Sequence, residues 1–359
     1  MSSHTSHTPP FLDRAFPVPR SLLLAEVALS AFDGELRIAD IRTIRGELRP
    51  RFFALHSIPE LRLDGSEKPD VANPIAELLA PHGYRFVRAV VHEDEAYVFS
   101  LVVPSTDMAV MRSAIESSLE ENVPIAPGDA IFEYEVVHVD VVKGETLVAV
   151  TVLSEKSLSS YAHFLEKSGV EVVAFDTEAR CLARALVPAH DDGVHAILHI
   201  GRKHSVMAIV ERGVVSFSSS IGVGSADVVT VVSKSLSLSA PDAEKLILER
   251  GFEVGQEDVR IFDASMPVLS TLHDEVGKML VYWKTKSKHA SFVPISDIII
   301  SGSYGLLNGV AKYISVTSQL PVRVGSVWTN VLDPKSNLPD LSQRDSLGYG
   351  TVIGALIQS

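Results

Sequence analysis

Two stretches of the chain, far apart in the sequence, begin with the same arrangement of strand-like segments. The first covers residues 22–57 and the second covers residues 195–219, with turns such as Asp33-Gly34 and Arg212-Gly213 between the segments. Segments with the apolar spacing of helices follow each stretch. A meander that recurs in this way predicts an internal structural duplication. The predicted strands are 22–29, 35–43, 48–57, 195–200, 205–211 and 214–219.

A compact unit is predicted between the two meanders, from residue 97 to residue 170. It combines strands with helices, and polar turns bound it on both sides. We therefore expect an α+β insert that is separable from the duplicated part. Its predicted elements are a strand at 97–103, a helix at 105–121, a hairpin at 131–153 and a helix at 157–168.

The second half continues with helices and short apolar strands. Apolar residues recur at helical spacing, and the run Ile298–Ser301 is typical of a buried parallel strand. A helix at 70–81 follows the first meander in the same way. The predicted elements of the second half are helices at 226–236, 240–250, 267–284, 305–317 and 348–357 and strands at 298–301 and 322–324.

Composition excludes several classes of protein. The chain has 359 residues with 32 Lys and Arg against 45 Asp and Glu, a net charge of −13, which argues against nucleic-acid binding. The lone cysteine, Cys181, excludes an intramolecular disulfide and a multi-thiolate zinc site within one chain. No apolar stretch approaches the ~20 residues of a membrane helix, and the N-terminus does not resemble a signal peptide. We expect a cytoplasmic protein that reaches a membrane only through a partner.

Several short segments carry a resemblance to a known family. Taken in order, they resemble motifs of the actin-like superfamily and, within it, of the PilM and FtsA group, whose PilM members assemble type IV pili. The resemblance covers about residues 21–359 and rests on the order and spacing of the motifs. The segments are Val123–Pro127 with Glu133–Glu135, Phe175–Ala179 with Leu182–Leu186, Ile221–Ser225 with Ser239–Glu244, and Ile299–Gly309.

The resemblance implies an α/β chain with a duplicated actin-like, ribonuclease H-like fold and an α+β insert subdomain. Residues 1–20, rich in Ser, Thr, His and Pro, are predicted to form a flexible tail. The implied division is a first actin-like domain (1A) at 21–96 and 171–194, an insert subdomain (1C) at 97–170, and a second actin-like domain (2A/2B) at 195–359.

The resemblance also implies a nucleotide site between the two domains, with ATP and magnesium as its ligands. Its phosphate turns are expected to need an Asp-x-Gly pattern, because glycine lets the backbone approach phosphate and the carboxylate organises magnesium. Taken without the resemblance, the glycines are more typical of ordinary turns and helix starts, and the resemblance makes the two interpretations about equal. The candidate nucleotide-binding residues are Ser30, Gly201, Lys203, Ser205, Gly222, Gly224, Glu244, Gly302 and Ser303.

This predicted site departs from the family pattern at several positions. Placing the first phosphate turn at residues 25–30 puts Glu26 and Ala28 where Asp and Gly are expected. In the second turn His199 replaces the Asp, and imidazole is a poor ligand for magnesium. The adenosine motif has Ser303 and Tyr304 in place of two glycines. The sequence therefore predicts a degenerate site without catalytic residues, in which ATP and magnesium binding are doubtful and hydrolysis is not expected.

Other chemistry is not indicated. His195, His199 and His204 lie close together in the sequence, but no carboxylate or thiol joins them at ligand spacing, so no metal site is expected. No serine lies in a Gly-x-Ser-x-Gly elbow.

By resemblance, the function would be that of a scaffold in a type IV pilus, or a related secretion or competence machine. It would bind the cytosolic tail of a PilN-like inner-membrane protein beside the insert. It would couple the inner-membrane complex to cytoplasmic motor ATPases, and self-association is a further expectation. The groove residues proposed for the tail are Val136, Val137, Val139 and Val141.

Two alternatives remain: an active ATP-binding enzyme of the superfamily, such as a small-molecule kinase, and an FtsA-like division protein. The altered phosphate turns count against the first. The chain end at Ser359 leaves no room for the membrane helix of the second.

Overall fold

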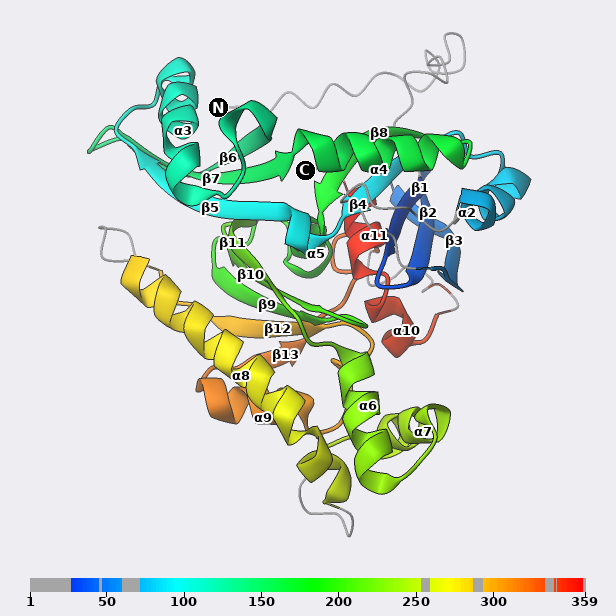
Figure 1. The fold of residues 1–359 in the computed structure, drawn as a ribbon. Coiled ribbons are helices and arrows are strands. Elements are labelled where there is room, and N and C mark those ends of the chain that lie inside the picture. Colours follow the sequence, from blue (N-terminus) through cyan, green and yellow to red (C-terminus); the bar gives the residue numbers. More distant parts are fainter. Residues whose placement is uncertain are drawn as a thin grey trace.

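A computed structural model describes residues 27–44, 47–59, 72–252, 259–286, 293–332, 339 and 341–357. The predicted tail at 1–20 and the start of the first predicted strand lie outside the described residues. Two five-stranded sheets dominate the fold, and their strand orders, β3-β2-β1-β4-β8 and β11-β10-β9-β12-β13, correspond position by position. The predicted duplication is confirmed (Figure 1).

Each sheet begins with an antiparallel meander, and two parallel strands extend it beyond the first strand. The first sheet comprises β1 (Val27–Phe32), β2 (Glu35–Ile44), β3 (Glu47–Ser57), β4 (Phe86–Val91) and β8 (Glu171–Thr177). The second comprises β9 (Val194–Ile200), β10 (Ser205–Glu211), β11 (Val214–Ile221), β12 (Asp297–Ser301) and β13 (Val322–Val324).

The central strands are apolar on both faces because helices cover both sides of each sheet. Every residue of β1, β9 and β10 is buried. Helices α5 (Glu178–Leu186) and α11 (Gly350–Leu356) pack in one core with the facing sides of both sheets, including Ala28 of β1 and Ile197 of β9. The two domains thus share a core, and this core holds the short α5–α11 pair between them.

The outer face of each sheet has its own helical layer. On the first sheet it is formed by α2 (Ala72–Leu79) and α4 (Glu155–Lys167). On the second sheet it is formed by α6 (Ser225–Leu236), α7 (Ala240–Arg250), α8 (Arg260–Lys286) and α9 (Val310–Ser318). Figure 1 shows α8 passing obliquely below this second sheet and continuing beyond it. The short α10 (Gln343–Leu347) precedes α11.

The insert has a sheet of its own, of order β5-β7-β6, and the predicted strand, helix and hairpin are present. It consists of β5 (Ala96–Val103), α3 (Met108–Asn122), β6 (Ala130–Asp140) and β7 (Glu145–Ser154), and α3 covers one face of the sheet. The predicted boundary at residue 170 is wrong for one element. Tyr161, Phe164 and Leu165 of α4 are buried in the core of the first domain, because this apolar stripe packs on that sheet.

Some predicted boundaries also differ from the structure. The helix expected from Pro267 begins seven residues earlier, at Arg260, because its apolar stripe extends back to Ile261 in the core of the second domain. The helix expected at 305–317 is α9, which begins only at Val310 after a series of turns. Among the described helices, none has the length and apolarity that crossing a membrane requires.

Candidate nucleotide cleft and its ion-pair network

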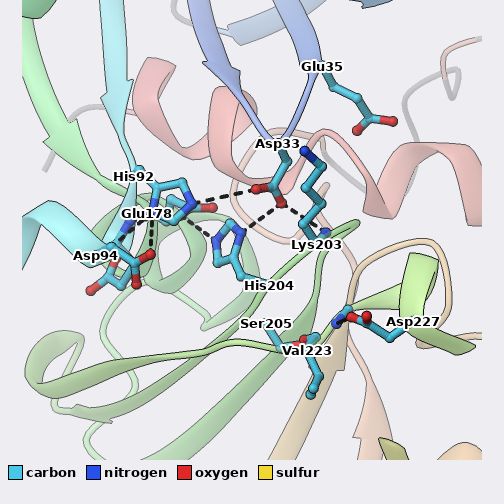
Figure 2. A network of polar contacts seen from close by, with 12 residues as sticks. Asp33, Glu35, His92, Asp94, Glu178, Lys203, His204, Ser205, Val223 and Asp227 are labelled. Carbon is cyan, nitrogen blue, oxygen red and sulfur yellow. Dashed lines mark hydrogen bonds and ion pairs between the residues drawn. The ribbon is translucent and has the colours of Figure 1, made fainter. Parts of the chain in front are cut away.

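The turns that follow β1 and β9 meet where the two domains face each other. Asp33 and Gly34 form the first turn, and both have positive φ angles, 59° and 72°. The Asp33 carboxylate receives two hydrogen bonds from the second turn: one from His204, with Nδ1 2.7 Å from Oδ2, and one from the Lys203 backbone N–H at 3.1 Å. These contacts, visible in Figure 2, join the two domains directly.

His204 also binds a carboxylate at the start of α5. Its Nε2 lies 2.8 Å from Oε2 of Glu178, the first residue of that helix. The same Glu178 oxygen accepts the Glu93 backbone N–H, and the Glu93 carboxylate accepts the Ala179 backbone N–H, each at 2.9 Å. Glu178 thus binds a backbone N–H of the Glu93 segment, and Glu93 binds one of the Glu178 segment. The His204 ring is held between Asp33 and Glu178.

His92 completes the network. It follows β4 directly, its ring lies 4.1 Å from the His204 ring between centroids, and its Nε2 is 3.6 Å from Oδ1 of Asp33. The other ring nitrogen, Nδ1, accepts the Asp94 backbone N–H at 3.1 Å and lies 3.6 Å from the Asp94 carboxylate. Four segments of the chain therefore converge on one buried polar cluster, made of Asp33, His92, Glu178 and His204.

The cluster has shifted proton affinities. Burial disfavours the His204 imidazolium, but the charge of Glu178 and the hydrogen bonds to Asp33 and Glu178 outweigh burial and raise its pKa to about 11. Burial also opposes ionisation of Asp33, yet its hydrogen bonds to His204 and His92 hold its pKa well below the usual range. Glu178 has a lowered pKa because the His204 charge overcomes burial. His204 is thus a cation bracketed by two carboxylates.

A second ion pair joins the two domains beside this cluster. Nη1 of Arg202, in the β9–β10 turn, lies 3.0 Å from Oε1 of Glu35 at the start of β2. Glu35 also pairs with Arg37 of the same strand. The two turns therefore present side chains of opposite charge to each other.

The backbone donors that would serve a phosphate in the second domain bind protein oxygens instead. At the N-terminus of α6, Ser225 donates to the Gly201 carbonyl and Ala226 to the Arg202 carbonyl, both at 2.9 Å. The Gly224 N–H bonds the Asp227 carboxylate. A helix N-terminus binds anions through its free N–H groups, so these bonds occupy the donors that such a site would use.

The glycines are required by close backbone approaches. A Cβ at Gly224 would lie 2.4 Å from the Arg202 carbonyl oxygen, and a Cβ at Gly302, whose φ is 87°, would lie 2.1 Å from the Ile200 oxygen. The candidate residues Gly201, Lys203, Ser205, Gly224 and Gly302 do gather at the carboxyl end of β9. Ser205, for example, donates its hydroxyl to the Val223 carbonyl at 2.7 Å.

Other candidate residues lie apart or are buried. Ser30 is enclosed within β1, and its hydroxyl has no hydrogen-bond partner among the described residues. Glu244 is exposed on α7, Gly222 is exposed in the loop before α6, and Ser303 lies near Gly348. The Tyr304 ring is buried in the core of the second domain. No contact described for these residues brings them into the cluster around Asp33.

The predicted position of the first phosphate turn is wrong. Ala28 lies inside β1 and pairs with Ala39 of β2, so the turn of this hairpin is Asp33-Gly34 and not 25–30. Glu26 lies outside the described residues. The second turn is where it was expected, and His199 stands at the end of β9, where burial lowers the pKa of its ring to about 4 and keeps it neutral.

The three clustered histidines of the sequence separate in the structure. His195 pairs with Asp297 and Asp191, His199 is enclosed at the end of its strand, and only His204 joins the polar cluster.

Sequence reasoning missed Asp33, His92 and Glu178 as site residues. The charged run His92–Glu95 immediately after an apolar segment was the available signal for one of them.

The proposed partner residues lie on the edge strand of the insert and just beyond it. Val136 and Val139 are exposed, Val141 is exposed in the turn after β6, and Val137 is buried at a bulge, where the register shifts. Val137 therefore cannot face a groove, and that part of the prediction is wrong. On β6, Glu133 and Glu135 pair with Arg180 of α5, which also contacts Asp176 of β8. Arg180 thus spans the junction between the insert and the first domain.

Two sheets of matching strand order with a helix pair in the core between them define an actin-like fold. The chain is similar to a chain of the PilM–PilN type IV pilus biogenesis complex, with a TM-score of 0.72 and 17% identity over 93% of this chain and 98% of that one. It also matches the ethanolamine utilization protein EutJ from Carboxydothermus hydrogenoformans (TM-score 0.48, 13% identity, 94% and 91% covered). MreB 5 of Spiroplasma citri bound to AMPPNP matches as well (TM-score 0.48, 12% identity, 91% and 93% covered). No protein-family model and no curated protein sequence matches.

Proposed function

We propose that this chain is a scaffold protein of type IV pilus assembly, or of a related secretion or competence machine. The observation that carries the proposal is its similarity to a chain of the PilM–PilN complex, which extends over nearly the full length of both chains, insert included. The proposed partner is the cytosolic tail of a PilN-like inner-membrane protein. The chain would be cytoplasmic, and this partner would hold it at the membrane surface. Pilus motor ATPases are proposed as further partners, and self-association as a further property.

The proposed docking region is the junction between the insert and the first domain. β6 is an edge strand of the insert sheet, and it pairs only with β7 in the parts of the chain that the structure describes. Such an edge offers backbone donors and acceptors to an extended segment, and exposed apolar residues beside it supply the contacts that repay the ordering of a flexible tail. Ile131, Val136 and Val139 of β6 are exposed in this way.

We further propose that the chain does not hydrolyse ATP. Three features support this: the α6 donors are bound to protein carbonyls, His199 is a neutral ring where a magnesium-organising carboxylate is expected, and His204 and Arg202 bind the carboxylates of the opposite turn. A small-molecule kinase needs a carboxylate that holds the metal ion. In this cluster the nearby carboxylates, Asp33 and Glu178, lie against the imidazole of His204, and imidazole is a poor ligand for magnesium.

Co-purification of the chain with a full-length PilN-like protein in detergent tests the proposal. Val139→Asp should abolish co-purification and leave the melting temperature nearly unchanged, because Val139 is exposed on an edge strand. Val316→Asp, an exposed valine on α9 of the second domain, is the matched control and should co-purify normally. Equal co-purification of both variants would contradict docking at β6. Failure of the unmodified chain to co-purify would contradict the proposed partner.

A further inference from the structure

The polar cluster between the domains has the composition of a transition-metal site. One ligand atom each from Asp33, His92 and His204 lies within 4.8 Å of the others. In a tetrahedral zinc site with bonds of about 2.0–2.2 Å, neighbouring ligand atoms lie roughly 3.3 Å apart. Asp33 faces the two rings with different oxygens: Oδ2 lies 2.7 Å from Nδ1 of His204, and Oδ1 lies 3.6 Å from Nε2 of His92. Binding one ion would therefore replace the Asp33–His204 hydrogen bond.

The surroundings of both histidines suit ligation. A metal-binding imidazole usually donates its second N–H to a carboxylate, which orients the ring. His204 has Glu178 at 2.8 Å from Nε2, which leaves Nδ1 to face Asp33. His92 directs Nε2 toward Asp33, and its Nδ1 accepts the Asp94 backbone N–H at 3.1 Å. Metal binding through Nε2 would place the ring proton on Nδ1 and exchange this bond for one to the Asp94 carboxylate, which lies 3.6 Å away. Figure 2 shows the two rings side by side with their inner nitrogens directed toward Asp33.

Charge and burial favour the same ligand. Asp33 and Glu178 are two buried carboxylates of the cluster, and a divalent cation that displaces the extra proton of His204 would balance both. Two imidazoles and one carboxylate favour zinc or a neighbouring transition metal over magnesium, which prefers oxygen ligands. The ligand set thus differs from the phosphate and water shell expected of magnesium in a nucleotide site.

We propose that Asp33, His92 and His204 bind one Zn²⁺ or similar transition-metal ion, with Glu178 and Asp94 orienting the two histidines. Asp33 and His92 belong to the first domain, and His204 belongs to the β9–β10 turn of the second. The bound ion would therefore be a link between the domains, and a water molecule would complete a fourth position. This site is independent of the partner proposed above.

Titration of the untagged, chelator-treated full chain with Co²⁺ tests the proposal, because four-coordinate Co²⁺ has characteristic visible absorption and Zn²⁺ should displace it. His4 and His7 are replaced by glutamine in all samples, so that they cannot bind metal. We expect one ion per chain, and with Zn²⁺ at 100 times its dissociation constant we expect the melting temperature to rise by roughly 5 °C.

Variants locate the site. His92→Gln, at a partly exposed ring, should weaken binding by about a hundredfold or more while circular dichroism shows a folded chain, and Asp94→Asn should weaken it by about tenfold. His195→Gln is the matched control, since His195 also contacts two carboxylates but lies elsewhere, and it should bind normally. Absence of equimolar binding, or unchanged affinity in His92→Gln, would overturn the proposal.

Discussion

Nδ1 of His204 lies 2.7 Å from Oδ2 of Asp33, although the two residues are 171 positions apart in the sequence. Each stands in the first turn of its own domain, so this contact joins the duplicated halves at equivalent places. His204 is simultaneously bound to Glu178 of α5, the helix packed in the core that both domains share. The contact therefore connects the relative position of the domains to the start of a buried helix.

Breaking this contact should destabilise the chain strongly. Asp33→Asn and His204→Gln should each lower the free energy of unfolding by about 3–5 kcal/mol, because each leaves a buried charge without its partner. The double variant should lose clearly less than the sum of the two losses. Chemical denaturation of the four chains, with a chelator present throughout, measures the coupling.

Arg112→Gln provides the control for that measurement. Arg112 pairs with Glu116 on the exposed surface of α3, and its loss should cost only about 0.5 kcal/mol or less. Strictly additive losses for Asp33→Asn and His204→Gln would show that the two side chains are not energetically coupled.

The meanders were predictable from sequence because turn residues such as Asp33-Gly34 and Arg212-Gly213 separate strands that pair with their neighbours in the sequence. β10 was placed at its observed bounds, and β2 and β3 within a residue of theirs. β4 and β8 were missed, since each is a short apolar run whose pairing partners are distant in sequence, and parallel pairing leaves no hairpin signal. The first predicted strand ended too early, at residue 29 instead of Phe32, and the phosphate turn was assigned to 25–30 and not to the Asp33-Gly34 turn.

The site could be predicted only in part for a related reason. Gly201, Ser205 and Gly224 lie within one stretch of the chain, so a motif could identify them. The polar cluster requires Asp33, His92, Glu178 and His204 to converge from four segments, and that convergence depends on the tertiary fold. Local composition therefore favoured an ordinary histidine at 204, either satisfied or on the surface, whereas the residue is 6% exposed and bound to two carboxylates.

Gly354 should tolerate no side chain. It lies in α11, and a Cβ there would lie 1.8 Å from the Cys181 carbonyl oxygen of α5, within the core shared by the domains. Gly354→Ala should therefore lower stability by at least about 3 kcal/mol, since neither helix has room to move. Thermal unfolding of the purified variant checks this.

Gly277→Ala is the opposite case and the control. Gly277 lies inside α8 with no atom within 4 Å of an added Cβ, so alanine should stabilise the helix by about 0.5–1 kcal/mol. Similar melting temperatures for the two variants would contradict the proposed close packing of α11 on α5.

His195 should give the chain a pH-dependent stability. Its hydrogen bond to Asp297, aided by Asp191, raises its pKa above the ordinary value near 6.5 despite partial burial. A raised pKa in the folded state contributes stability that is complete below pH 6.5 and is lost as pH rises through the folded pKa. After allowance for solvent screening, the loss should be on the order of 0.5–1 kcal/mol.

The measurement compares the unmodified chain with His195→Gln between mildly acidic and mildly alkaline pH. The difference in unfolding free energy between them should shrink as pH rises. His204 contributes in the same direction in both chains and therefore cancels. A difference that grows with pH would mean that His195 is destabilised as a cation, contrary to its contacts.

Magnesium-ATP should not bind the unmodified chain with micromolar affinity, and phosphate release should stay at background. The α6 N–H groups and the Lys203 N–H are bound to protein oxygens, so a nucleotide would have to replace hydrogen bonds that are already made. His199→Asp should stay inactive as well, since it restores a single carboxylate and leaves those donors occupied. Calorimetric titration and a steady-state phosphate assay measure both quantities.

A double variant, Asp33→Asn with Glu35→Gln, removes both interdomain ion pairs and tests whether they exclude the nucleotide. Gain of saturable binding in this double variant alone would identify the ion pairs as the barrier, whereas saturable micromolar binding by the unmodified chain would show that the cleft accepts ATP.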